Sequence, residues 1–432
     1  MVTPVQARTG SPAARVLFAS MIGTTIEFFD FYIYATAAVL VFPKLFFPKS
    51  DPATASLQAF ATFALAFIAR PVGSALFGHF GDRIGRKATL VSALLTMGLS
   101  TVLIGLLPTY SSIGVAAAAL LCLCRLGQGL GLGGEWGGAV LLATENAPPG
   151  SHAWYGSFPQ QGAPAGYFCS TAVFLLLAYG LDDAQFLAWG WRVPFLASAV
   201  LVIVGLYIRL RLVETPAFQR VLDQGERVRV PVLVVLKRHA PQLIVGIFAT
   251  TTTFTIFYLM AVFSLSWATG SLGYPRKDFL ILELVTVPLF AATIPLSGLI
   301  ADRIGGRAMM IVASVALFLF GFAFAPLFVS GSRISVFAFL ALGFALTGLT
   351  YGPIGSFLAT LYPTEVRYTG TSLTFNFAGI LGASVAPSIA LWLAKDHGIA
   401  WVGYYLSAGS AVSLLALLAL KPAYLPAAPP RP

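Results

Sequence analysis

The chain has 432 residues, of which 58% are hydrophobic and only 10% are charged. Soluble domains contain about 25% charged residues, so this composition excludes a soluble globular protein and indicates one that is embedded in a membrane. The net charge of +10 does not point to nucleic acid, because the basic residues gather between long apolar segments, as in the loops of a membrane protein. The three cysteines lie within apolar segments, so we expect no disulfide framework.

Twelve apolar segments are long enough to cross a bilayer as helices, which takes about 20 residues each. They lie near residues 18–41, 57–80, 88–107, 113–143, 154–178, 192–212, 240–267, 278–300, 308–329, 334–361, 370–393 and 401–420. Most Lys and Arg residues fall on the side that holds both termini and the turn at residues 78–87. The positive-inside rule therefore predicts cytoplasmic termini, and we expect a multi-pass protein of the plasma (inner) membrane.

A charged turn occurs twice and divides the chain in two. Residues 78–87 read GHFGDRIGRK, and residues 298–307, which lie 220 positions later, read GLIADRIGGR. An internal repeat of this kind predicts two copies of one structural unit. We therefore expect an all-α membrane protein in which twelve transmembrane helices form two pseudo-symmetric six-helix bundles.

The expected bundles cover residues 15–212 and 240–420. The stretch between them, residues 213–239, is polar and rich in Arg, which is typical of a cytoplasmic linker with amphipathic helices at the lipid surface. Residues 1–14 and 421–432 are expected to form cytoplasmic tails without regular structure.

The first span contains two acidic residues, Glu27 and Asp30, on one helical face near the middle of the membrane. An acid at this depth costs about 2.5–3.5 kcal/mol on insertion scales and usually has a function. Two carboxylates three residues apart repel each other, so one is expected to hold a proton part of the time, as a proton carrier requires. The alternative is a packing role, in which both acids only pair with an Arg of a neighbouring helix.

Two basic residues are expected inside the membrane, Arg70 in the second span and Arg125 in the fourth. In the fourth span, Gln128, Leu132 and Glu135 are expected on the same helical face as Arg125. This stripe indicates a polar path, although Arg125 and Glu135 would lie in the same places if each only braced another helix. The many glycines between residues 127 and 138 predict close packing against a neighbour.

The fifth span holds Gln161 between two prolines, which should bend the helix and direct its amides towards protein or water. In the second half of the chain, Tyr351 and Asn376 are the best candidates for polar contacts with a substrate. The glycines and the proline at residues 348–353 are expected to break the tenth span.

These patterns resemble the major facilitator superfamily, whose loop signature reads Gly-x-x-x-Asp-Arg/Lys-x-Gly-Arg-Arg/Lys. The second copy differs from the signature, because Gly306 stands where an Arg is usual. Within the superfamily the chain is similar to the metabolite:proton symporters, which carry carboxylates and zwitterions. The supporting stretches are residues 27–31 (EFFDF), 70–73 (RPVG), 125–138 (RLGQGLGLGGEWGG), 191–194 (WRVP), 214–218 (ETPAF) and 363–367 (PTEVR).

The resemblance implies proton-coupled uptake of a small organic acid, of the mono-, di- or tricarboxylate type, by alternating access around a midplane site. It also implies that Arg125 faces Asp30 or Glu27. Proton coupling is expected at Glu27, Asp30 or Glu135. Substrate contacts are expected at Arg70, Arg125, Gln128, Gln161, Tyr258, Tyr351 and Asn376. A cytoplasmic gate is expected at Gly78, Asp82, Arg83, Arg86, Glu145, Asp302, Arg303, Glu365 and Arg367.

Two alternatives compete with an organic acid carrier. The first is a carrier of zwitterionic osmolytes such as betaine or proline, whose cationic group would contact aromatic rings by cation–π interaction. The rings available for this are Phe28, Phe29, Tyr32, Phe254, Phe257 and Tyr258. The second is a membrane enzyme, but the sequence contains neither an HExxH metal motif nor a phosphate-binding GxxxxGK[ST] loop. We therefore expect a monomeric carrier with a small-molecule substrate, a proton and the bilayer as partners, and no enzyme activity, cofactor, metal or nucleic acid.

Overall fold

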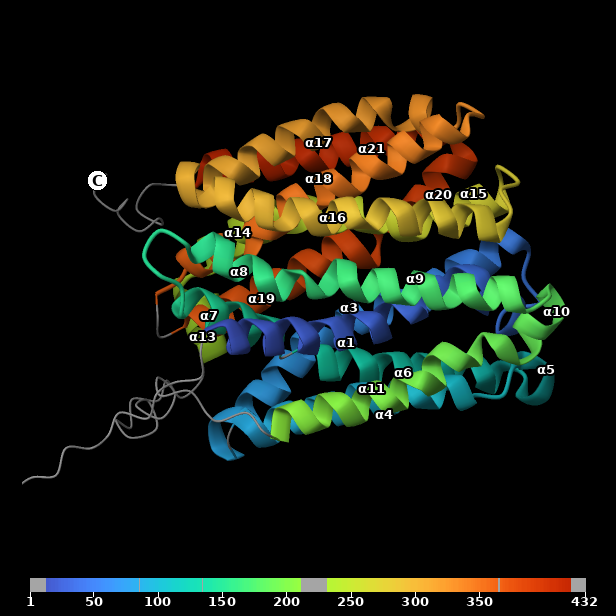
Figure 1. Ribbon diagram of the computed structural model, residues 1–432, viewed down its shortest axis with the longest axis horizontal. Helices are drawn as coiled ribbons and strands as arrows, with labels where there is room; N and C mark the ends of the chain where they lie inside the picture. Colours follow the sequence, from blue (N-terminus) through green and yellow to red (C-terminus); the bar gives the residue numbers. More distant parts are fainter. Residues whose placement is uncertain (1–12, 85, 134, 211–230, 364–365, 421–432) are drawn as a thin grey trace, which may run out of the picture.

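The computed structural model describes residues 13–84, 86–133, 135–210, 231–363 and 366–420 (Figure 1). All regular secondary structure in these ranges is helical, and the long helices run side by side along one common direction. The expectation of an all-α fold is confirmed.

The first half of the chain begins with α1 (Ala13–Leu40), a long helix that contains both Glu27 and Asp30. The helices that follow it are α2 (Phe42–Leu45), α3 (Pro52–Ile84), α4 (Arg86–Leu106), α5 (Tyr110–Ile113), α6 (Val115–Leu132), α7 (Trp136–Glu145), α8 (His152–Gln160), α9 (Gly162–Gly180), α10 (Asp183–Gln185), the π-helical turn η1 (Phe186–Gly190) and α11 (Arg192–Leu210).

The second half begins with the short helix α13 (Pro231–Arg238), which ends in Lys237 and Arg238. The helices that follow it are α14 (Ala240–Tyr258), the π-helical turn η2 (Leu259–Phe263), α15 (Ser264–Gly270), α16 (Arg276–Ile304), α17 (Gly306–Phe328), α18 (Arg333–Thr360), α19 (Arg367–Gly379), the π-helical turn η3 (Ile380–Ser384), α20 (Ala386–Asp396) and α21 (Ile399–Ala419).

Nine helical stretches of the described residues are long and apolar enough to cross a membrane, and a tenth is the pair Asp183–Gly190 and Arg192–Tyr207, which is bent by 40°. Helices also occupy the other two predicted spans. These are α1, and α4, whose described side chains include the apolar stretch Val91–Leu106. The chain is a multi-pass membrane protein.

The fourth predicted span contains α6, which ends at Leu132, and α7, which begins at Trp136, and together they form one candidate membrane span, Val115–Glu145. Arg125 and Gln128 are buried on α6, and Glu135, at the N-cap position of α7, is half-buried. Residue 134 lies outside the described residues, so the polar stripe from Arg125 to Glu135 stays a prediction.

The tenth predicted span differs from expectation, because α18 runs unbroken through Pro353. Its glycines serve close packing against α16 instead of breaking the helix. A Cβ at Gly348 or Gly352 would collide with the backbone carbonyls of Phe290 or Ile294 in α16. On the other half of the chain, Gly129 of α6 meets the backbone of Ala66 in α3 in the same way, as is common where membrane helices cross closely.

The two halves of the chain contact each other along the bundle. Helices α8 and α9 of the first half pack against α16 and α18 of the second, and α3 packs against α19, η3 and α20. We call the end of the bundle that holds residues 145–152 and 304–306 the first end (left in Figure 1). The opposite end, which holds residues 181–183 and 271–276, is the second end.

Candidate functional site

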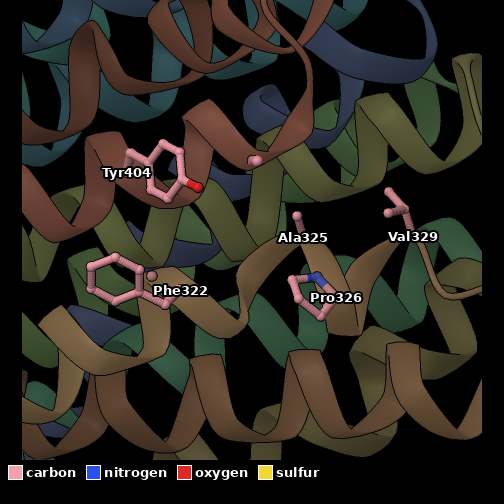
Figure 2. Close-up of a pocket in the computed structure, with 7 residues that line it drawn as sticks. Phe322, Ala325, Pro326, Val329 and Tyr404 are labelled. Atoms are coloured by element: carbon pink, nitrogen blue, oxygen red, sulfur yellow. The ribbon is translucent and has the colours of Figure 1, made fainter.

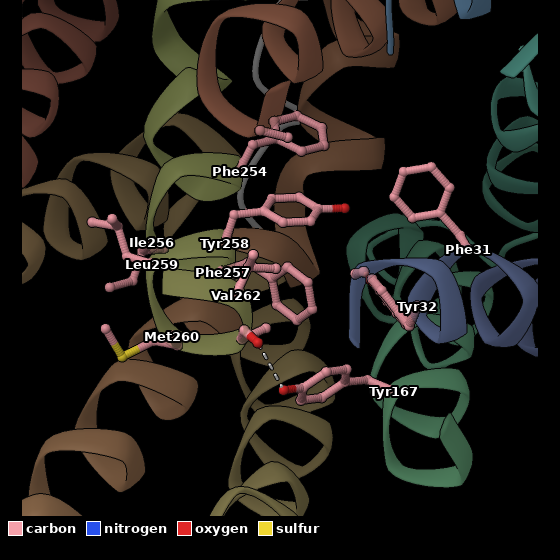
Figure 3. Close-up of a cluster of buried hydrophobic side chains, with 14 of the residues drawn as sticks. Phe31, Tyr32, Tyr167, Phe254, Ile256, Phe257, Tyr258, Leu259, Met260 and Val262 are labelled. Carbon is pink, nitrogen blue, oxygen red and sulfur yellow. Dashed lines mark hydrogen bonds between the residues drawn. The ribbon is translucent and has the colours of Figure 1, made fainter. Parts of the chain in front are cut away.

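The interface between the halves is lined with aromatic side chains about midway along the bundle (Figure 3). Tyr32 of α1 lies 5.4 Å from the ring of Tyr167 in α9 and 5.1 Å from that of Phe257 in α14. Tyr258 of α14 contacts Phe63 and directs its hydroxyl group towards Phe31. Rings from three or more helices of both halves thus meet at one level of the bundle.

Arg125 is fully buried at this level, on α6. Its Nη1 donates a hydrogen bond of 2.8 Å to Gln128 Oε1, and its Nε donates to the carbonyl oxygen of Phe63. Its guanidinium lies 4.0 Å from the ring centre of Tyr34 and 4.2 Å from that of Phe31. Nη2 has no hydrogen-bond partner, so its N–H groups remain available to a ligand.

Arg70 of α3 approaches the same ring, because its guanidinium lies 4.5 Å from the centre of Phe31 and 4.5 Å from that of Phe67. It is 4% exposed, and its Nε has no hydrogen-bond partner. Tyr32, Tyr258, Tyr351 and Glu27 are its electrostatic neighbours. Within the described part of the chain, neither Arg70 nor Arg125 forms a salt bridge.

Two buried cations around one phenyl ring are energetically unusual. Removing an isolated charged group from water costs several kcal/mol unless a counter-charge and hydrogen bonds compensate. Cation–π contacts recover only part of this cost, about 2 kcal/mol each when desolvated. The arrangement is therefore suited to an anion that enters the site and completes the hydrogen bonds of both guanidinium groups.

Asp30 is linked to Arg125 through a chain of polar side chains and not by a direct ion pair. Ser198 of α11 donates a hydrogen bond of 2.6 Å to Asp30 Oδ1, and Thr101 of α4 is a further hydrogen-bonding neighbour of this carboxylate. Gln128 Nε2 donates to Thr101 Oγ1 at 2.8 Å, and Gln128 Oε1 accepts from Arg125. One buried network thus connects the acid of α1 with the base of α6.

The other two acids considered for proton coupling lie in different surroundings. Glu27 is buried on α1 and is an electrostatic neighbour of both Asp30 and Arg70. Glu135 is half-buried at the N-cap position of α7. The structure therefore places Glu27 beside Asp30 and Arg70, and it links Asp30 to Arg125 through Gln128.

Three further polar residues expected to bind substrate differ in whether they already have hydrogen-bond partners. The Tyr351 hydroxyl is buried and has no hydrogen-bond partner, so it is available to a ligand. Asn376 Nδ2 donates to Ser74 Oγ at 3.0 Å and to the carbonyl oxygen of Gly133, which joins α19 to the first half. Gln161 Nε2 donates to the carbonyl oxygen of Ala291 at 2.8 Å, which also joins the halves. Asn376 and Gln161 thus connect helices in this form of the protein.

At the first end, a carboxylate of the second half binds the start of a helix of the first. Asp302 accepts hydrogen bonds of 2.8 and 2.9 Å from the backbone N–H groups of Ala153 and Trp154, in the first turn of α8. The partial positive charge of a helix N-terminus favours an anion there. Arg367 and Glu145 add an ion pair across the halves at 3.9 Å, with both side chains partly exposed.

The remaining residues of the expected gate are only partly described. Gly78, Asp82, Arg83 and Arg86 lie at the junction of α3 and α4, but their side chains are outside the described part of the structure, as is Glu365 entirely. Arg303 is exposed at the end of α16.

The second end is also held together by contacts between the halves. Arg276, at the start of α16, forms a salt bridge of 3.1 Å with Asp183, at the start of α10. Its guanidinium also lies 4.1 Å from the ring centre of Phe186. The halves are therefore in contact at both ends and at the aromatic level between them.

Two shallow hollows lie away from this polar site. One is lined by residues of α17 and α21, including Phe322, Pro326 and Tyr404, on a face that exposes these side chains (Figure 2). The other lies at the second end and is lined by Tyr274, Pro275 and Arg333, among others. Neither contains a group of polar side chains comparable to that around Arg125. Among the described residues, no group of three His, Cys, Asp or Glu side chains is placed to hold a metal ion.

Several residues of the site were not identified from the sequence. Ser198, Thr101 and Phe31 surround the acid and the arginines, but a single Ser, Thr or Phe in an apolar helix carries no distinguishing pattern. Only the depth of Asp30 and Arg125 in apolar segments gave a signal, because charges at that depth are rare.

Comparisons with known proteins agree with this architecture. Residues 20–383 match the family described as the Major Facilitator Superfamily. An inner membrane metabolite transport protein of Escherichia coli (YhjE) is 56% identical over 421 residues, which cover 96% of this chain and 94% of the relative. The shikimate transporter of the same organism is 35% identical over 95% of both chains. The proline/betaine transporter of Escherichia coli is 32% identical, covering 94% of this chain and 83% of that protein.

Solved structures resemble the chain in fold. The proton:xylose symporter XylE, bound to 6-bromo-6-deoxy-D-glucose, superimposes with a TM-score of 0.73 over 94% of each chain, at 15% sequence identity. An inward-open form of the xylose transporter gives a TM-score of 0.69 over 94% of this chain and 95% of that one. At this level of identity the likeness concerns the arrangement of helices.

Proposed function

Because this chain belongs to the Major Facilitator Superfamily and is a metabolite transporter of that family, not an enzyme, we propose that it is a proton-coupled symporter for a small organic acid. The observation that supports an acidic substrate is the pair of buried guanidinium groups of Arg70 and Arg125 on the ring of Phe31. Both keep a buried N–H group that has no hydrogen-bond partner.

A carboxylate fits this position better than a neutral sugar does. The planar fork of Arg binds a carboxylate through two parallel hydrogen bonds, and these are stronger than bonds between neutral groups. The unpartnered Tyr351 hydroxyl, an electrostatic neighbour of Arg70, would donate to the same anion. Two arginines would bind a monocarboxylate tightly, and they would also bind a dicarboxylate with one carboxylate at each guanidinium.

Proton coupling is proposed to use Asp30, through its network with Arg125. When Asp30 is ionised, hydrogen bonds through Thr101 and Gln128 connect its negative charge to the guanidinium of Arg125. Protonation removes that charge and leaves the substrate as the anion that neutralises Arg125. Proton and substrate would therefore each raise the affinity for the other, as linkage between two sites requires. Glu27 and Glu135 stay in the proposal as alternative proton carriers.

Alternating access would open one end of the bundle at a time around this site. Opening the first end requires that Asp302 leave the amides of α8 and that Arg367 leave Glu145. Opening the second end requires that Arg276 leave Asp183. We propose that the first end faces the cytoplasm, that both termini lie on that side, and that the protein works as a monomer in the inner membrane.

Uptake into proteoliposomes tests the proposal directly. The purified protein would be offered mono-, di- and tricarboxylates, betaine, proline and xylose, with and without an inward proton gradient. We expect accumulation of one class of organic acid only when the gradient is present. Gradient-driven accumulation of betaine or proline, with no response to any carboxylate, would exclude the organic acid and favour the second candidate.

The second candidate is a carrier of zwitterionic osmolytes, and the aromatic cluster is the observation that favours it. Rings of Tyr32, Tyr167 and Phe257 approach one another at 5.1–5.5 Å and could surround a quaternary ammonium group. In the present form these rings pack on each other, so a cation would have to separate them. Arg125 Nη2 and Arg70 Nε, by contrast, already lack a hydrogen-bond partner in this form, which is why we place the anion first.

A further inference from the structure

Glu283, on α16, is a buried carboxyl group that the proposed transport cycle does not use. It is 0% exposed, and neither of its carboxyl oxygens has a hydrogen-bond partner. It lies seven residues, or about 10 Å, from the start of α16 at the second end of the bundle. An ionised carboxylate without donors at such a place costs several kcal/mol, so this closed form accommodates the neutral acid far better than the anion.

The neighbourhood of Glu283 offers an acceptor for the proton of a neutral acid. The Tyr167 hydroxyl of α9 lies beside the carboxyl group and donates its own proton to the carbonyl oxygen of Ala261 at 3.3 Å (Figure 3). The lone pairs of that hydroxyl oxygen therefore remain available to accept from a protonated Glu283. Ala261 lies in the π-helical turn η2, where the regular hydrogen-bond pattern of the helix changes.

Other charges do not explain a buried acid at this position. Helices α8, α9, α15, α17 and α18 pack against α16, and from these Tyr167 is the titratable group that acts on Glu283. The charged groups in the first turn of α16 have other partners: Arg276 pairs with Asp183, Asp278 pairs with Arg333, and Lys277 lies over the ring of Tyr179.

The acid lies at a boundary that must open during transport. Tyr167 belongs to the first half of the chain, whereas Glu283 and Ala261 belong to the second, so this contact joins the halves. In the alternating-access movement proposed above, opening of the second end would separate α9 from α16 and admit water to the carboxyl group. The anion is then hydrated and becomes the favoured form at neutral pH.

We propose that Glu283 is a proton-binding site between the halves, which must take up a proton before the second end closes. The closed form holds one more proton here than the open form, so a fall in pH favours closure. This site is separate from Asp30, which lies on α1 and bonds with Ser198 of the same half. The inference rests on the alternating-access movement proposed above but not on the chemistry of the substrate.

Distances across the second end, measured without substrate, test the inference. Gly180 and Gly270 end α9 and α15 in opposite halves, both are exposed, and a Cβ at either position meets no atom within 4 Å. Cysteines at these positions, in a chain whose Cys122, Cys124 and Cys169 are replaced, can carry spin labels. Double electron–electron resonance in nanodiscs then gives the ratio of closed to open forms from acid to alkaline pH.

We expect the ratio of closed to open forms to fall by up to about tenfold per pH unit as pH rises, because closure binds one proton. In Glu283→Gln, whose amide resembles the neutral acid, the closed form should persist and the ratio should change by less than about twofold over the same range. Tyr167→Phe removes the acceptor, so the pH response should remain but move to lower pH. Asp396→Asn, at an exposed carboxyl of α20, is the matched control and should behave as the wild type.

Either of two results would overturn the proposal. The first is a ratio of closed to open forms that does not respond to pH when Glu283 is intact. This result would mean that Glu283 is a permanently neutral packing residue, and it does not depend on whether a Glu283 variant folds. The other is an unchanged pH response in Glu283→Gln, which would assign the response to another group. The substrate assay is independent of both results, because the distances are measured without substrate. A carrier that does not move organic acids could therefore still close in response to a fall in pH.

Discussion

Arg70 and Arg125 are the residues on which the substrate hypothesis depends. Their guanidinium groups lie 4.5 and 4.2 Å from the centre of one phenyl ring, Phe31. Like charges repel, and burial strengthens that repulsion, so an empty site of this kind stores electrostatic energy. Binding an anion to their unpaired N–H groups would reduce this repulsion.

The first prediction concerns the planar guanidinium group at position 125. Arg125→Lys keeps the charge but loses the planar fork, so carboxylate affinity should fall at least about tenfold, or about 1.4 kcal/mol. Substrate binding to the purified protein by calorimetry measures this. The matched control is Arg192→Lys, because Arg192 bonds the carbonyls of Gly105 and Leu107, away from the site, and should bind substrate normally.

Near-normal carboxylate binding by Arg125→Lys would mean that Arg125 only holds helices together. In that case the affinity should depend instead on Arg70, and Arg70→Lys would show the loss. If neither variant changes the affinity, the substrate does not bind at this ring.

The second prediction separates proton movement from substrate movement. Asp30→Asn cannot take up a proton, so the variant should not accumulate substrate, although a 100 mV potential still supplies about 2.3 kcal/mol per charge. Exchange of external for internal substrate needs no net proton flow and should persist. Binding should also lose its pH dependence, since in the wild type affinity should rise as pH falls. Asp278→Asn, which alters an exposed ion pair with Arg333, should accumulate substrate as the wild type does.

Retained accumulation in Asp30→Asn would move the coupling role to Glu27 or Glu135. Both can be examined in the same assay with Gln in place of Glu. Loss of exchange together with accumulation would instead indicate damage to the site itself.

At the scale of residues, the sequence predicted which charged side chains lie buried in the bundle but not their connections. A membrane makes a buried Asp or Arg conspicuous, so Asp30, Arg70 and Arg125 could be chosen without a structure. Their contacts could not, because Ser198 and Thr101 come from helices whose rotation about their own axes is set by packing. Whether Arg125 meets Asp30 directly or through Gln128 depends on that rotation.

Among the elements, α8 is the helix whose N-terminus connects the two halves. The Asp302 carboxylate accepts from two of its backbone amides, which are among the groups that a helix leaves unpaired in its first turn. Hydrogen bonds to a charged group each contribute about 1.5–3 kcal/mol. This contact should therefore bias the bundle strongly towards a closed first end.

The third prediction follows from that bias. Asp302→Asn should raise the open fraction of the first end at least about tenfold, because two charge-assisted bonds are weakened. Spin labels at cysteines replacing Pro149 and Ile304, which lie on opposite halves, would report the opening. Glu145→Gln is the control, since its ion pair with Arg367 is long and partly exposed and should contribute no more than about 1 kcal/mol.

An equal opening in both variants would show that the net charge at this end controls the opening, and not the specific hydrogen bonds of Asp302. No opening in Asp302→Asn would show that the amides of α8 find another acceptor, and the proposed gate would then be wrong.

At the scale of elements, prediction was limited by what glycine and proline can mean. The glycines at residues 127–138 predicted close packing against a neighbour, and Gly129 and Gly133 do meet the backbone of α3. Residues 348–353 looked like a break, but α18 continues through Pro353 and its glycines allow contact with α16. The same residue types permit a kink or a close crossing, and only the neighbouring helix decides between them.

For the whole molecule, the fold could be predicted because two independent signals agree. The spacing of apolar segments gave the helices, and the repeated charged turn gave the division into halves. The family match and the likeness to solved transporters support the same architecture. The substrate could not be predicted in this way, since relatives of similar sequence carry shikimate in one case and proline or betaine in another.

The fourth prediction concerns orientation in the membrane. If the first end is cytoplasmic, a cysteine at Gln224 should be hidden from a membrane-impermeant thiol reagent in intact cells, and one at Ala184 should react. The background must lack Cys122, Cys124 and Cys169. Permeabilised cells provide the control, because both positions should then be labelled. The reverse pattern in intact cells would place the first end outside and overturn the proposed orientation.

The bonds between Asp302 and α8 also determine which mutations the gate can tolerate. The donors are main-chain N–H groups of Ala153 and Trp154, so a change of side chain there leaves the donors in place. Only proline removes such a group. The acceptor, by contrast, is a single side chain whose loss cannot be replaced from the same helix turn. In a population of random variants selected for transport, position 302 should therefore stay acidic, while position 154 should exclude proline but keep its amide donor with any other residue.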